Sequence, residues 1–140
     1  VYVADRENHR VQVFDGNGRY ETQWNNLHRP CALCRCGGKQ ANFIIGELGP
    51  GLAVNRKVPN LGPRLSIVDA KGNRIARLGG ENGPGVEAGK FLAPHGIAMD
   101  SRGDIYLGEV GVTDWKTSFP DTPMPPEVAV SRCLQKLEKI

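Results

Sequence analysis

The sequence predicts an all-β fold made of repeated antiparallel sheets, and three observations support this prediction. The 140 residues include 18 Gly and 10 Pro, and they lack the long Ala/Glu/Lys/Leu-rich windows of helical domains. Short runs of alternating apolar and polar residues recur along the chain, with Gly- and Asn-containing turns between them. These runs repeat with a period of roughly 40 to 60 residues, which is typical of the blades of a β-propeller.

One strand motif marks each repeat. It consists of three apolar residues, a small residue and an acid, and it occurs at residues 1–5, 43–47 and 105–109. Two of the three copies follow a short apolar strand that is opened by a proline, at Pro30 and Pro94. Because one such sheet cannot bury both of its faces, we expect neighbouring units to stack on each other.

A hairpin follows the motif in the first two units. Residues 10–15 and 64–69 each run from an arginine through alternating apolar positions to an aspartate. A Gly- and Asn-containing turn comes next in both units, and a further strand begins at Arg19 or Arg74. Glycine supplies the positive φ angles that tight hairpin turns require. The pattern therefore predicts four short strands in a complete unit.

The expected strands group into three units along the chain. We expect three strands without an innermost one at residues 1–25, and a full four-stranded blade at 27–80. The last blade is expected at 91–140, with strands at 95–100, 104–110 and near 131–140. Because apolar faces would be left exposed, this piece is expected to be poorly stable by itself unless it pairs with another copy.

Two long connectors interrupt these units. One runs from residue 49 to 63, and the other is a Pro-rich insertion at 111–128 that is expected to be a loop. They directly follow the strand ends at Glu47 and Glu109, so we expect them to project from one face and to wall a possible cleft. The alternative is an insertion packed on itself through Trp115 and Phe119. The acids themselves are expected to bond backbone amides, as a repeated feature.

The composition argues against nucleic acid as a partner and against a membrane-spanning segment. The net charge is only +3, and the 18 Lys and Arg residues are scattered along the chain. The sequence therefore lacks the basic patch that is typical of nucleic-acid-binding proteins. The sequence contains no apolar run approaching the roughly 18 residues that span a membrane. The compartment is left open, with a lean toward the cytoplasm from cysteines expected to be free thiols.

A resemblance to a known family rests on two segments. Residues 1–14, Val-Tyr-Val-Ala-Asp-Arg-Glu-Asn-His-Arg-Val-Gln-Val-Phe, closely resemble the NHL repeat, and residues 91–100 resemble its opening half. The Ala-Asp-Arg-Glu-Asn string, followed later by Pro94-His95, is similar to peptidyl-α-hydroxyglycine α-amidating lyases and their bacterial NHL relatives. The resemblance implies a six-bladed propeller, of which this chain supplies about the C-terminal half. It also implies a zinc-dependent lyase that cleaves the N–Cα bond of a peptidyl-α-hydroxyglycine.

The same resemblance assigns two site residues. His95 corresponds to one of three zinc-binding histidines, and Arg6 to an active-site arginine. Three imidazoles leave zinc an open position, and a guanidinium suits a substrate carboxylate. The other ligands would lie upstream of Val1, so this piece is expected to be inactive alone. Gly96 stands where the family has a calcium-binding aspartate, which puts calcium in doubt.

Other readings of the functional residues stay open. Two functions compete: an enzyme, and a non-catalytic NHL propeller that binds a protein, peptide or glycan. A calcium-dependent lactonase-like propeller fits more loosely. Cys31, Cys34 and Cys36 form a Cys-x2-Cys-x-Cys cluster that suggests a metal, a disulfide or free buried thiols. His9 and His28 are expected to be solvated.

Overall fold

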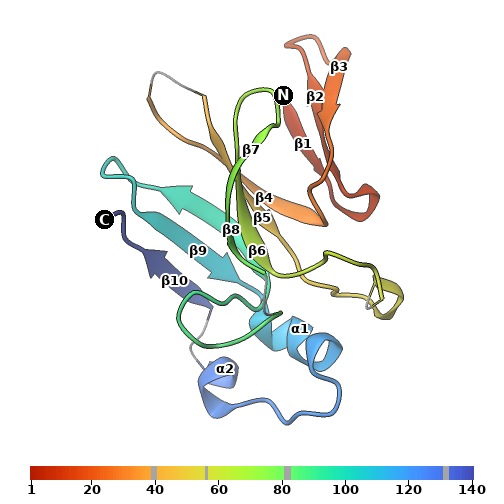
Figure 1. Cartoon of the computed structure of the whole chain (residues 1–140), viewed down its shortest axis with the longest axis vertical. Helices are drawn as coiled ribbons and strands as arrows, with labels where there is room; N and C mark the ends of the chain where they lie inside the picture. Colours follow the sequence, from red (N-terminus) through yellow and green to blue (C-terminus); the bar gives the residue numbers. More distant parts are fainter. Residues whose placement is uncertain (39–40, 56, 81–82, 131–132) are drawn as a thin grey trace.

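The computed structural model describes residues 1–38, 41–55, 57–80, 83–130 and 133–140. It contains three antiparallel sheets, which lie side by side in chain order (Figure 1). Within each sheet the neighbouring strands are consecutive in the sequence, as the hairpin pattern predicts. The sheets are thus blade-like, while closure into a ring and a total of six blades stay predictions.

The first sheet has three strands, the second four and the third three. The first sheet consists of β1 (Tyr2–Asp5), β2 (Arg10–Phe14) and β3 (Tyr20–Trp24). The second consists of β4 (Pro30–Arg35), β5 (Phe43–Glu47), β6 (Arg64–Val68) and β7 (Arg74–Gly79). The third consists of β8 (Pro94–Met99), β9 (Ile105–Glu109) and β10 (Leu134–Leu137).

The predicted repeat is visible in the strand register. Pro30 lies opposite Glu47 in the second sheet, and Pro94 lies opposite Glu109 in the third. A β-bulge follows the proline in both pairs. The motif acid therefore ends the same strand of the sheet in both units.

The apolar residues of the strands form two clusters between the sheets. Ile45 of β5 belongs to a cluster with Val11 and Trp24 of the first sheet, whereas Ile44 packs with Ile105 and Leu107 of the third. Successive side chains of a strand point to opposite faces. The second sheet is therefore covered on both faces, which is the stacking that the repeat predicts.

Two equivalent hairpin turns depend on glycine. The amides of Gly18 and Gly72 donate to the carbonyls of Asp15 and Asp69, at 3.2 and 3.0 Å. Their φ angles are +80° and +82°, in the left-handed region that residues with a Cβ avoid. The turns differ in their surroundings. A Cβ at Gly18 would have no neighbour within 4 Å, whereas a Cβ at Gly72 would overlap the indole of Trp24.

Substituting these two glycines is expected to separate backbone strain from steric overlap. Gly18→Ala should cost about 1 kcal/mol of unfolding free energy, because only the positive φ is penalised. Gly72→Ala should cost about 2–4 kcal/mol, because the new methyl group also displaces a core side chain. Urea unfolding of the two variants measures the difference. Equal losses would show that the Trp24 contact carries no penalty.

The insertion at 111–128 is helical, so the prediction of a loop was wrong there. It contains α1 (Gly111–Ser118) and α2 (Pro126–Val130). Trp115 and Val128 pack on Leu92 in a third apolar cluster, and the rings of Trp115 and Phe119 lie 4.3 Å apart, one helical turn from each other. The prolines that suggested a loop lie between the helices or at the first residue of α2, where proline is tolerated. No helix in the described part of the chain is long and apolar enough to cross a membrane.

Candidate functional site

The segments that follow the three motif acids lie at one end of the sheets (Figure 1). They are the 3₁₀ turn η1 (Arg6–Asn8), the connector that contains η2 (Ala53–Asn55), and α1. This is the arrangement expected for the two long connectors. We call this end the connector rim.

Glu47 and Glu109 are buried in the fold beneath this rim. The Glu47 carboxylate accepts hydrogen bonds from the His28 amide at 2.7 Å and from Arg64 Nη2 at 2.8 Å. Glu109 Oε1 accepts from the amides of Leu92 and Ala93, at 2.6 and 3.1 Å. Each acid thus fastens the segment that enters its blade, as predicted for a repeated feature. Neither is an unpartnered carboxylate facing a cleft.

Asp5, the first motif acid, has different partners. Its carboxylate accepts from the side chains of Asn8, Arg10 and Gln12, each at 2.8 Å. The hydrogen bond from Arg10 is the largest cause of a lowered pKa for Asp5. Asp5 therefore anchors η1, the turn that carries Arg6.

The rim brings Arg6 and His95 around a carboxyl that the sequence did not single out. Arg6 is exposed and pairs with Glu7 at 3.0 Å, and His95 is exposed near the start of β8. Asp114 of α1 is half-buried, and its burial raises its pKa. Electrostatic interactions with Arg29, Arg6 and His95 oppose that rise.

A buried arginine, Arg29, holds Glu7, the residue that pairs with Arg6. Arg29 is 4% exposed, and its guanidinium donates to Glu7 Oε1 at 2.9 Å and to the Gly49 carbonyl at 2.7 Å. The hydrogen bond from Arg29 is the largest cause of a lowered pKa for Glu7. Arg29 thus links η1 to the connector after β5, and Glu7 in turn holds Arg6.

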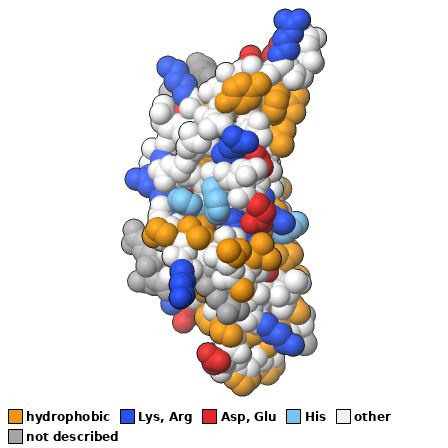
Figure 2. Space-filling view, turned by 90° about the vertical axis from the view of Figure 1, so that its right-hand side faces the viewer, with side chains coloured by type: hydrophobic (Ala, Val, Ile, Leu, Met, Phe, Trp, Pro, Cys, Tyr) orange, Lys and Arg blue, Asp and Glu red, His pale blue; other side chains and the backbone are white. Residues whose placement is uncertain are grey.

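His9 and His28 form a second part of the rim. They are half-buried rather than solvated as predicted, and their rings lie 5.6 Å apart. The Arg29 amide donates to His9 Nδ1 at 3.1 Å, and burial lowers the pKa of His28. Figure 2, which looks at the right-hand side of the view in Figure 1, shows imidazoles near the middle of the molecule, next to acidic and basic side chains. Packing of the first sheet on the second buries them, which a local pattern does not reveal.

Left-handed backbone conformations gather in the same place. His9, Arg29 and Asn60 have φ angles of 56°, 49° and 62°. Such angles in residues other than glycine cost free energy, and they are enriched at binding sites. Asn60 contacts His28 Nε2 at 3.2 Å, so the three residues belong to one network.

The metal-ligating residues do not assemble into a site. Among the residues that the structure describes, no three His, Cys, Asp or Glu side chains are placed to hold a metal ion. Cys31, Cys34, Cys36 and Cys133 are free thiols, and Cys34 and Cys36 pack against the cluster between the second and third sheets. Burial raises the pKa of Cys36, as expected for an apolar environment. Two of the three cysteines of the motif, Cys34 and Cys36, therefore contribute to packing.

Comparison with known proteins supports the repeat. A comparison with curated proteins finds no match. The NHL repeat family matches residues 1–14, the segment that contains Asp5, Arg6 and β2. The match is limited to this segment, and the three antiparallel sheets are consistent with NHL blades.

Proposed function

We propose that the connector rim binds a small peptide-like ligand between Arg6, His95 and Asp114. One observation supports this proposal above all: the half-buried carboxyl of Asp114 on α1 interacts electrostatically with Arg6, which follows β1, and with His95 of β8. An exposed guanidinium can bind a carboxylate or carbonyl in planar geometry. A carboxyl beside it can bond a peptide N–H. Together these groups provide a hydrogen-bond donor and a hydrogen-bond acceptor for the terminus of a peptide.

The test uses a fluorescein-labelled tetrapeptide with a free C-terminal carboxylate, and the same peptide as its C-terminal amide. Arg6→Gln is expected to weaken binding of the carboxylate about fivefold, since an exposed charge pair contributes roughly 1 kcal/mol. Binding of the amide should change little. Arg19→Gln, in the distant β2–β3 turn, is the matched control. Equal weakening by both variants, or no binding by the unaltered protein, would contradict the proposal.

A second candidate is the α-amidating lyase activity that the resemblance implies. It is favoured by the proximity of both assigned residues, Arg6 and His95, to Asp114. The raised pKa of Asp114 suits a group that gives a proton to a departing amide nitrogen. The described residues supply one exposed imidazole and no three-ligand group, so they do not fit a complete zinc site. We therefore assign no step to zinc.

Zinc content separates the two candidates. Elemental analysis of the native protein should give about one zinc per chain if the lyase candidate is right, and His95→Ala should lose it. Absence of zinc from the native protein would remove the lyase candidate and leave peptide binding intact.

A further inference from the structure

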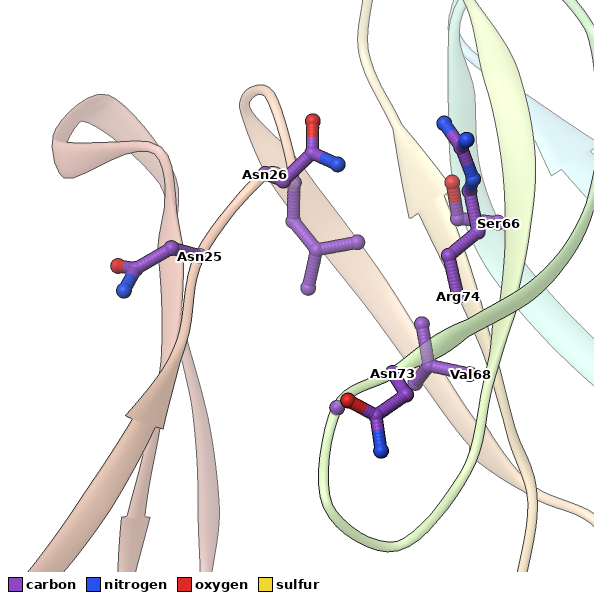
Figure 3. Close-up of a pocket in the computed structure, with 8 residues that line it drawn as sticks. Asn25, Asn26, Ser66, Val68, Asn73 and Arg74 are labelled. Atoms are coloured by element: carbon purple, nitrogen blue, oxygen red, sulfur yellow. The ribbon is translucent and has the colours of Figure 1, made fainter.

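A polar groove begins between the first and second sheets and continues along the second sheet to Asn60 of the connector after β5. Its first part is a cavity of about 220 Å³, lined by Asn25, Asn26, Leu27, Ser66, Val68, Gly72, Asn73 and Arg74. Figure 3 shows Asn26 of the β3–β4 connector on one side and Ser66 and Arg74 of the second sheet on the other. A second cavity, of about 370 Å³, is lined by Asn60, Arg64, Arg74, Arg77, Gly79 and Gly80. Arg74 lines both, so the two cavities adjoin.

The groove carries an excess of positive charge. Three arginines line it, and no acid is among the described residues that do so. Two carboxylates are bonded to lining residues: Glu47 is buried and paired with Arg64 at 2.8 Å, and Asp69 accepts a hydrogen bond from Asn73 Nδ2 at 2.9 Å. Burial lowers the pKa of Arg77, and the charges of Arg64 and Arg74 lower it further. A bound anion would relieve this repulsion.

Donors remain available for such an anion. Arg77 Nη2 donates to the Asn26 carbonyl at 2.8 Å and Arg77 Nε to Ser66 Oγ at 3.2 Å, which fixes the guanidinium across the two sheets. None of the hydrogen bonds found between described side chains uses Arg77 Nη1 or the exposed Arg74 guanidinium. One arginine is therefore held in place by the fold, and the other can close on a ligand.

The lining indicates which anion fits. It includes no aromatic ring, on which sugars and bases usually stack. It includes four asparagines; Asn60 is bonded through both its amide atoms, whereas Asn25, Asn26 and Asn73 are each bonded through one and keep the other for a peptide backbone. We propose that this groove binds an acidic peptide segment, with its carboxylates on Arg74 and Arg77 and its backbone on the asparagine amides.

The test measures fluorescence anisotropy with labelled hexaglutamate that is blocked as a C-terminal amide. The rim proposal is tested through Arg6 and this one through Arg74, so the two proposals fail separately. Arg74→Gln is expected to weaken binding five- to tenfold at low salt, because it removes a charge-assisted hydrogen bond. Arg19→Gln, also an exposed arginine, should change binding by less than twofold. Hexalysine should not bind.

Three outcomes would overturn the proposal. The first is the absence of hexaglutamate binding at 50 mM salt. The second is equal weakening by Arg74→Gln and Arg19→Gln, which would indicate general attraction to a basic protein. The third is tighter binding of a sulfated hexasaccharide that depends on Arg74, which would identify a glycan as the occupant. Arg74 is exposed on β7. Its substitution is therefore expected to leave folding intact, so a loss of binding reports on the groove.

Discussion

Replacing Glu47 by alanine is expected to lower the free energy of unfolding by about 3–5 kcal/mol. Glu47 is fully buried, and the side chain of its partner Arg64 is 5% exposed. Arg64 donates to Glu47 Oε2 through both Nε and Nη2, at 3.0 and 2.8 Å, and Ser66 Oγ donates to Oε1. The alanine variant leaves the buried guanidinium without its counter-charge. Urea unfolding would measure the loss.

Two further variants test the reason for that loss. Glu21→Ala removes an exposed acid of β3 and should change stability by less than about 0.5 kcal/mol. The double variant Glu47→Leu/Arg64→Met removes both charges and should lose less than Glu47→Ala alone, because no unpaired charge remains. If the double variant were the less stable of the two, an unpaired Arg64 would not explain the result.

The strands and turns could be predicted because their signals are local. Alternation within residues 10–15 and 64–69 fixes which side chains share a face, and Gly18 and Gly72 occupy positions that need a positive φ. The role of Glu47 and Glu109 as anchors of backbone amides also followed from their shared register, and the structure confirms it.

The site depends on contacts between distant parts of the chain, and there the sequence was less informative. Four prolines between 120 and 126 suggested a loop, although the 115/119 spacing of aromatic residues was a signal for a helix. Without that helix, Asp114 had no reason to be placed near Arg6 or His95. The burial of His9 and His28 likewise comes from packing between sheets. Metal ligation by His95 stays a prediction.

Truncation of Trp24 is expected to have the second large effect, a loss of about 3–5 kcal/mol in Trp24→Ala. The indole is 2% exposed and lies 5.1 Å from the rings of both Tyr2 and Phe43. It joins β3 to the second sheet, so its removal opens a cavity in the cluster between the sheets. Thermal and urea unfolding would both report the change.

Trp24→Phe is expected to cost much less, about 1 kcal/mol. The indole N–H is buried without a hydrogen-bond partner among the described residues, which is itself unfavourable by about 1–3 kcal/mol. Phenylalanine loses some packing area but also removes that unsatisfied donor. A loss in Trp24→Phe as large as in Trp24→Ala would show that the indole N–H is satisfied in solution.

The same residue also decides the cost of Gly72→Ala, because the indole occupies the space that a Cβ at this position needs. Substitutions at residues in contact are not additive, so the two changes should be strongly coupled. In the Trp24→Ala background, Gly72→Ala should cost no more than Gly18→Ala does in the unaltered protein, since only the positive φ remains to be penalised. If Gly72→Ala cost the same in both backgrounds, the penalty would come from the turn conformation alone. The contact between the turn and the indole would then not link the two hairpins.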